Sequence, residues 1–381
     1  MAQELFLLHP HLRQFVTQAG QAHLLIHASI ISYVPLSHQL ILCGIALKEK
    51  QSSIVRNEFV EPNQQTVGEW LRFYVNEIAA INVRLSTYKI HHDNMELHLI
   101  PALGRYHLQD PHLRDYIQSF VNSQCRAGYA TSSIKRQMAV LKSAFREAQN
   151  RQYLLKNPAD HIILPKMEQK EIDALSQDEV KLLLPHLPKN TSGRALRFIL
   201  GTGLRVGELC GLRWEDVGAN FIHIKQTTAI LTIEGKTQRV TNPPKTKNGK
   251  RQIPLNPSLT GILHEQKQVQ CQEQMKAGEE WKGGVAGQGE QFVFASMLGT
   301  PADRDNLGRC LRSTLKKAGL KSRGLHALRH TFATLWVQRG GDLKTLSEIL
   351  GHANVAFTMS IYVHSDMETK KKYMDMMGEI L

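Results

Sequence analysis

The sequence is poor in the features of disulfide-rich, zinc-binding and secreted chains. Its five cysteines lie far apart and form no CxxC pair: Cys43, Cys125, Cys210, Cys271 and Cys310. That spacing argues against a zinc site and a disulfide framework, and it suits a reducing cytoplasm. The first residues lack a basic stretch followed by a clean apolar run, so we expect no secretory signal.

A long stretch near the start lacks charge of either sign. No Asp, Glu, Lys or Arg occurs between Arg13 and Lys48. His, Ser, Pro and Gln side chains interrupt the apolar residues of this stretch, so it does not predict a membrane-spanning helix.

Acidic residues are outnumbered along the whole chain. The 381 residues include 47 Lys and Arg against 34 Asp and Glu, which gives a formal net charge of +13. This excess favours a polyanionic partner, and nucleic acid ahead of a membrane surface. Charge alone does not distinguish a DNA-binding protein from an enzyme that acts on DNA.

The pattern along the chain predicts a helical part followed by a mixed part. Residues 1–60 carry no recognisable chemistry. Apolar residues at helical spacing predict an all-helical domain over 61–165. Residues 166–381 combine helices with short strands and form a further domain. We therefore expect a mainly α fold with a small antiparallel β-sheet, of the α+β class.

Two groups of basic side chains are candidates for contact with DNA phosphates. The outer face of a helix predicted from Thr131 carries Lys135, Arg136, Lys142 and Arg146. Asn248-Gly249 predicts a β-hairpin turn. Around it lie Lys245, Lys247, Lys250 and Arg251. Ordinary solvation of a charged helix face is the alternative explanation for the first group.

A helix beginning near His326 would place His326, Arg329 and His330 on one side, because residues three and four apart share a face. These groups repel each other when charged, so packing alone does not favour them. An anion would explain them, since Arg offers a planar fork for phosphate oxygens and His a donor or a proton acceptor. The helix that follows, ending at Gly351, leaves a DNA-reading helix-turn-helix as a competing interpretation.

The second domain as a whole has the groups that phosphoryl transfer by a protein nucleophile requires. They are Arg205, Lys245 (or Lys247), His326, Arg329, His352 and Tyr362. The arginines would neutralise the non-bridging oxygens, and Tyr362 would attack the phosphorus and hold it covalently. Lys245 would protonate the departing sugar oxygen, and His326 would assist proton transfer at the tyrosine. No carboxylate cluster suited to Mg²⁺ accompanies them, so no metal or other cofactor is expected.

Together these motifs resemble the tyrosine recombinase, or phage integrase, family. They are Thr202-Gly203-Leu204-Arg205-Val206-Gly207-Glu208-Leu209, Lys245, His326-Ala327-Leu328-Arg329-His330-Thr331, Leu350-Gly351-His352 and Ile361-Tyr362. All six catalytic residue types occur in the family's order. Residues 66–165 are similar to its helical core-binding (SAM-like) domain. The resemblance implies a C-shaped clamp on duplex DNA, a 3′-phosphotyrosyl intermediate and a tetramer that exchanges strands without ATP.

The resemblance also implies roles outside the chemical steps. Glu208 matches an acidic position that orients its neighbours. The expected partners are duplex DNA attachment sites, an excision factor or a DNA-bending host protein, with no membrane, in a bacterial cytoplasm at the nucleoid. The amphipathic segment Met367–Leu381 would dock on a neighbouring subunit or fold back onto its own domain.

Three functions could use these residues. A site-specific recombinase that integrates or excises a mobile element uses the whole set. A type IB-like topoisomerase would share the covalent chemistry but needs no oligomer. A non-catalytic DNA-binding regulator would fit a broken catalytic set, and this set is intact. We therefore expect the recombinase.

Overall fold

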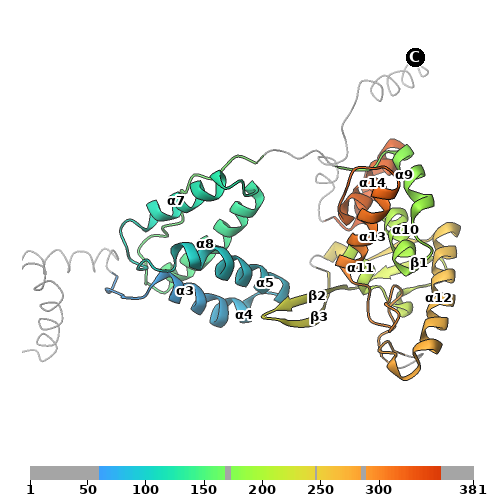
Figure 1. The fold of residues 1–381 in the computed structure, drawn as a ribbon, viewed down its shortest axis with the longest axis horizontal. Coiled ribbons are helices and arrows are strands. Elements are labelled where there is room, and N and C mark those ends of the chain that lie inside the picture. Colours follow the sequence, from blue (N-terminus) through green and yellow to red (C-terminus); the bar gives the residue numbers. More distant parts are fainter. Residues whose placement is uncertain (1–59, 168–172, 245–246, 285–288, 353–381) are drawn as a thin grey trace, which may run out of the picture. The chain divides into compact units, whose positions relative to one another are not determined.

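The structure is a computed structural model that describes residues 60–167, 173–244, 247–284 and 289–352 (Figure 1). The chain divides into two compact units, one ending at Met167 and one running from Glu168, and Leu85–Lys89 group with the second. The predicted N-terminal segment 1–60 lies outside the described residues except for Val60.

The first unit is helical. Its elements are α3 (Val67–Phe73), the π-helix η2 (Tyr74–Ala79), α4 (Ala80–Asn82), α5 (Leu85–Asn94), the π-helix η3 (Met95–Leu99), α6 (Ile100–Leu103), α7 (Leu113–Arg126) and α8 (Thr131–Asn150). Thr66 and Glu69 form a capping box at the start of α3. The Trp70 indole donates a 3.0 Å hydrogen bond to the Ala144 carbonyl and so ties α3 to α8.

The second unit combines helices with two small antiparallel sheets. Its elements are α9 (Gln177–Leu183), η4 (Leu184–His186), α10 (Thr191–Thr202), α11 (Val206–Gly211), η5 (Trp214–Asp216), β1 (Phe221–Ile224), β2 (Thr227–Ile233), β3 (Lys236–Asn242), η6 (Lys247–Gly249), β4 (Arg251–Pro254), α12 (Pro257–Ala277), η7 (Gly278–Glu280), α13 (Arg304–Lys317), α14 (Leu325–Gln338) and α15 (Leu343–Leu350). Strand β1 pairs with β4, and β2 pairs with β3. The mainly α fold with a small antiparallel β component is therefore confirmed.

The hairpin turn lies at Glu234-Gly235, so the prediction of a hairpin at Asn248-Gly249 is wrong. Both Glu234 and Gly235 have positive φ, 49° and 76°, as a two-residue turn between antiparallel strands requires. Asn248-Gly249 instead belongs to the 3-10 turn η6, which connects β3 to β4. Lys247 consequently begins a turn between the two sheets, and Lys245 lies outside the described residues.

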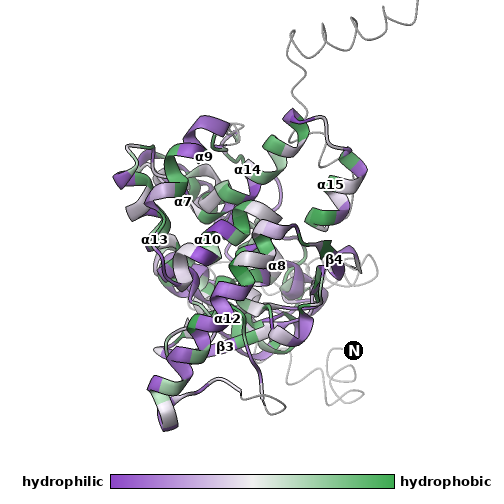
Figure 2. Ribbon diagram, turned by 90° about the vertical axis from the view of Figure 1, so that its right-hand side faces the viewer, coloured by the Kyte–Doolittle hydropathy of each residue, from purple (hydrophilic) through white to green (hydrophobic). Residues whose placement is uncertain are grey.

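The core of the second unit is built around α10, whose buried residues Ala195, Leu196, Phe198 and Ile199 join one hydrophobic cluster. Green hydrophobic and purple hydrophilic segments alternate along the helices, as amphipathic packing requires (Figure 2). In the part of the chain that the structure describes, every helix is too short or too polar to span a bilayer.

Two left-handed glycines end the helices that lead into the functional residues. Gly203, with φ 67°, caps α10, and Gly351, with φ 66°, caps α15. The stop at Gly351 is the one that the sequence analysis predicts. Each glycine lets the chain reverse within one residue, so Arg205 and His352 follow directly after a rigid helix end.

Candidate active site

Arg205 occupies the N-cap position of α11 and is held by the acid three residues further on. Its backbone N–H donates to Oε2 of Glu208 at 2.9 Å, and its Nη1 donates to Oε1 at 2.9 Å. The Arg205 side chain is 38% exposed. Its Nη2 donates a longer hydrogen bond of 3.4 Å to the Gly351 carbonyl, so the guanidinium is held in place while part of it remains accessible to an external anion.

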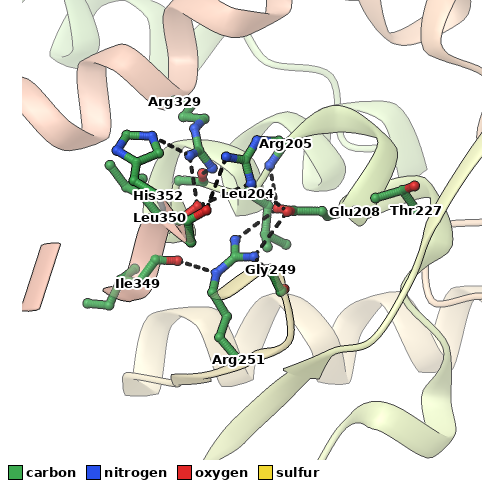
Figure 3. Close-up of polar contacts among 12 residues, drawn as sticks. Leu204, Arg205, Glu208, Thr227, Gly249, Arg251, Arg329, Ile349, Leu350 and His352 are labelled. Atoms are coloured by element: carbon green, nitrogen blue, oxygen red, sulfur yellow. Dashed lines mark hydrogen bonds and ion pairs between the residues drawn. The ribbon is translucent and has the colours of Figure 1, made fainter. Parts of the chain in front are cut away.

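Arg329 comes from α14 and meets Arg205 at a shared backbone carbonyl. Its Nη1 donates to the Gly203 carbonyl at 2.8 Å, and its Nη2 donates to the Leu350 carbonyl at 2.8 Å. Arg205 Nη1 donates to the same Leu350 oxygen at 3.3 Å (Figure 3). That oxygen belongs to the last turn of α15, where the helix dipole makes carbonyls attractive to cations. Two guanidiniums from distant parts of the sequence thus converge on one point.

His352 completes this cluster as a neutral imidazole. Its Nε2 lies 2.9 Å from Nη2 of Arg329, and since a guanidinium has only donors, Nε2 is the acceptor. Burial, together with the nearby charges of Arg329 and Arg205, lowers the pKa of His352 to about 4. The ring therefore carries no charge near neutral pH.

Two further histidines lie on the first turns of α14, as the sequence spacing predicts. Burial, then the charges of Arg304 and Arg329, lower the pKa of His326 below its ordinary value. Burial, then His326, lower the pKa of His330. A neutral imidazole can accept a proton, which a site for a deprotonated nucleophile requires.

Glu208 is the buried anion of the site, with a side chain only 1% exposed. Burial alone would raise its pKa, but hydrogen bonds and charge from Arg251, with those of Arg205, outweigh burial and lower it. Arg251 donates from Nη1 to Oε1 at 3.0 Å and from Nη2 to Oε2 at 2.8 Å. Arg251 is among the predicted DNA-contacting residues, and in the structure its side chain is 6% exposed and bonded to Glu208.

Residues 173–369 match the phage integrase family. This chain belongs to that family. Similar proteins include a XerC-like tyrosine recombinase of Caldanaerobacter subterraneus, 30% identical over 351 residues and 88% of each chain. The ICEBs1 integrase of Bacillus subtilis is 25% identical over 287 residues, which cover 72% of this chain and 75% of that integrase.

Solved integrases share the fold. The Tn1549 transposon integrase in complex with circular intermediate DNA matches with a TM-score of 0.66 at 22% identity, over 82% of this chain and 99% of that one. The lambda integrase tetramer bound to a Holliday junction matches with a TM-score of 0.59 at 19% identity, over 93% and 88%.

The chain is a site-specific tyrosine recombinase, an enzyme that cuts and rejoins DNA strands. The matches are to recombinases and integrases, so they favour this function over the topoisomerase and the regulator.

The described structure brings together part of the predicted catalytic set. Arg205, Arg329 and His352 form one hydrogen-bonded cluster, and His326 lies one turn before Arg329 on α14. Lys245, Tyr362 and Met367–Leu381 lie outside the described residues, and only the backbone of Lys247 is described. No local pattern in the sequence marks Arg251 as part of the site, because its contact with Glu208 joins residues 43 apart.

The predicted DNA-contacting side chains of the recombinase are mostly exposed. On α8, Arg136, Lys142 and Arg146 are exposed and Lys135 is half-buried, and Lys250 is exposed in the second unit. Lys142 and Arg146 pair with opposite oxygens of Asp160, at 2.9 and 3.7 Å. Exposed pairs of this kind contribute little stability, so Asp160 holds both cations only weakly.

Proposed function

We propose that this recombinase integrates or excises a mobile element by cutting and rejoining duplex DNA at its attachment sites, with Tyr362 as the nucleophile. The observation that carries the proposal is the convergence of Arg205 and Arg329 on the Leu350 carbonyl, beside the neutral His352. Two guanidiniums held at one point match the non-bridging oxygens of a phosphodiester.

In the proposed cleavage step, the predicted residues account for the bond exchange at phosphorus and for both proton transfers. The Tyr362 oxygen forms a bond to phosphorus as the bond from phosphorus to the 5′ oxygen breaks, which leaves a 3′-phosphotyrosyl link. His326 accepts the tyrosine proton, and Lys245 gives a proton to the departing 5′ oxygen. Arg205 and Arg329 stabilise the charge that builds on the phosphoryl oxygens. A 5′ hydroxyl from the partner strand reverses these transfers, so no ATP is consumed.

The proposal extends to the assembly on DNA. The solved complexes of integrases with circular intermediate DNA and with a Holliday junction support duplex DNA as partner and a tetramer as the active form. In it, residues 61–165 act as the core-binding domain that closes a clamp with the catalytic domain 166–381, and Met367–Leu381 docks on a neighbouring subunit. The proposed setting is the bacterial cytoplasm at the nucleoid, with an excision factor or a DNA-bending host protein as accessory partner.

The test is to trap the covalent intermediate on a nicked duplex that carries the element's own attachment site, taken from DNA flanking the gene. The wild-type chain should accumulate a covalent adduct, because the nicked strand diffuses away before it can be rejoined. Tyr362→Phe should bind the duplex but form no adduct. Tyr129→Phe, a matched change at an exposed tyrosine of the first unit, should form it normally. An adduct of ordinary yield from Tyr362→Phe would show that Tyr362 is not the nucleophile.

A further inference from the structure

Glu208 shares its carboxylate between two arginines of very different exposure. The Arg205 side chain is 38% exposed, whereas that of Arg251 is 6% exposed. Arg251 approaches both carboxylate oxygens with its two terminal nitrogens, which is the strongest geometry open to such a pair. Arg205 reaches only Oε1 with its side chain, since Oε2 accepts from its backbone N–H.

Arg251 also ties together three segments that surround the proposed phosphate site. Its Nε donates to the Ile349 carbonyl at the end of α15, and its Nη1 donates to the Gly249 carbonyl in η6 at 3.1 Å. Asn248 in the same turn donates to the His352 carbonyl at 3.3 Å. The strand residue Arg251 thus connects α11, the end of α15 and the turn that follows Lys245.

The positive charge of Arg251 determines how strongly Glu208 offsets the charge of Arg205. Two guanidiniums and one carboxylate leave a net charge of +1 at this point of the site. If Arg251 were neutral, the carboxylate of Glu208 would cancel the charge of Arg205, and the pair would attract a phosphate far less. A buried carboxylate also needs a full set of donors, and Arg251 supplies two of the four hydrogen bonds that Glu208 accepts, the other two coming from Arg205.

We propose that Arg251 is a positioning residue that neutralises Glu208, so that Arg205 keeps its positive charge for the scissile phosphate. The inference rests on the proposed function of Arg205 in DNA cleavage. Arg251 itself is too buried to reach DNA and takes no part in the chemical step. Glu208 then orients the Arg205 side chain through its hydrogen bonds without cancelling the positive charge of that guanidinium.

The pKa of Glu208 gives the proposal a signature that packing alone would not produce. The described charged groups that face Glu208 are Arg205 on α11 and Arg251 on β4. Replacing Arg251 by a neutral residue removes the largest influence that opposes burial, so the pKa of Glu208 rises. Protonation of Glu208 in this variant then begins at a higher pH and removes the negative charge that cancels Arg205. The cleavage defect of the variant relative to wild type should therefore shrink as the pH falls through the raised pKa of Glu208.

The experiment compares single-turnover cleavage by the full-length protein at saturating nicked duplex. Arg251→Met should lower the cleavage rate roughly 10–100-fold, somewhat less than the loss of a direct donor. Its Kd for the duplex should stay within about threefold of wild type, since many other phosphate contacts remain. The ratio of its cleavage rate to that of wild type should rise as the pH falls.

The double variant Glu208→Gln with Arg251→Met keeps the test decisive even if the single variant folds poorly. It leaves no buried carboxylate to cancel Arg205, so it should cleave at least tenfold faster than Arg251→Met, and its rate relative to wild type should not rise as the pH falls. A double variant as slow as the single one would overturn the proposal, because that result would mean that Arg251 matters through packing.

Arg194→Met is the matched control for the loss of a buried arginine. Arg194 is 4% exposed and donates to Gln266 at 2.8 Å and Glu265 at 3.2 Å, away from the Glu208 cluster. Folded Arg194→Met protein should cleave like wild type, and an equal loss in both variants would refute the inference. Failure of wild-type protein to form the Tyr362 adduct would instead reject the proposed function, so the two failures are distinguishable.

Discussion

His352 shows at the residue scale how burial and neighbouring charge set the protonation of a side chain. Burial and the guanidiniums of Arg329 and Arg205 favour the neutral imidazole. The neutral ring accepts a hydrogen bond from Arg329 and so fixes the direction of that guanidinium. A charged ring would lose this bond and repel both arginines.

The lowered pKa of His352 predicts a pH dependence of stability. Its folded value of about 4 lies below the ordinary 6.5, so the unfolded chain binds more protons between these values. The contribution of this histidine is complete above pH 6.5 and is lost as the pH falls toward 4. His352→Gln keeps a hydrogen-bond acceptor but cannot titrate. The variant should therefore lose less free energy of unfolding than wild type between pH 7 and pH 4.5, measured by urea denaturation.

His326 and His330 have pKa values shifted in the same direction, so part of the pH dependence persists in His352→Gln. The comparison therefore rests on the difference between the two proteins. Identical changes in unfolding free energy for both would show that His352 is as easily protonated in the folded chain as in the unfolded one.

At the scale of elements, local signals predict helix starts and stops, whereas long-range pairings escape them. Capping by Thr66, Ser176 and Asp342 follows from neighbouring residues alone, and the structure has all three. Strand β3 escapes prediction because Lys236–Asn242 is polar and mostly exposed, so no alternation marks it. The Asn248-Gly249 turn is wrongly predicted as a hairpin because its contacts with Gly351 and His352 are distant in sequence.

In the functional site, too, the residues in local motifs can be predicted from the sequence, whereas the long-range contacts cannot. Short local motifs that resemble those of the recombinase family are enough to select Arg205, Glu208 and Arg329. The partner of Glu208 is not found from the sequence, because Arg251 looks there like any other cation of a basic cluster. Only the fold distinguishes a buried arginine from an exposed one.

The tight turn at Gly203 leaves no room for a side chain. A Cβ there would lie 2.5 Å from Cδ1 of Phe332 and 2.9 Å from Cδ2 of Leu350, at a φ of +67°. Gly203→Ala should lower the free energy of unfolding by ~1–2 kcal/mol for the left-handed backbone and by a further ~1–3 kcal/mol for overpacking. Gly319→Ala, at φ +70° with open space around it, should show the backbone cost alone. Equal losses in urea denaturation would contradict the steric part.

The basic residues behind the net charge of +13 are spread over the whole molecule. Among the surfaces that carry them, we expect the outer face of α8 in the first unit to contact DNA. Lys135→Gln with Arg136→Gln should weaken DNA binding and reduce the slope of log Kd against log salt by about 0.9 for each phosphate that the variant no longer neutralises. Fluorescence anisotropy over a series of salt concentrations measures this slope. Cleavage at saturating DNA should stay at the wild-type rate.

Lys181→Gln is the matched control, because Lys181 is an exposed cation on α9 that pairs with Asp178. It removes one charge without touching the α8 face, so its salt slope should equal that of wild type. If the α8 variant kept the wild-type slope as well, ordinary solvation would be the correct explanation of this basic face.

The convergence on the Leu350 carbonyl also sets the moment in protein synthesis at which the site can form. Arg205 and Leu350 are 145 residues apart, so the arginine emerges long before its partner is made. At 5–20 residues per second, a ribosome needs roughly 7–30 s to cover that separation. A nascent or truncated chain that stops short of Leu350 carries the basic helical unit without the assembled arginine pair, and on the proposed function it can hold DNA but cannot break it.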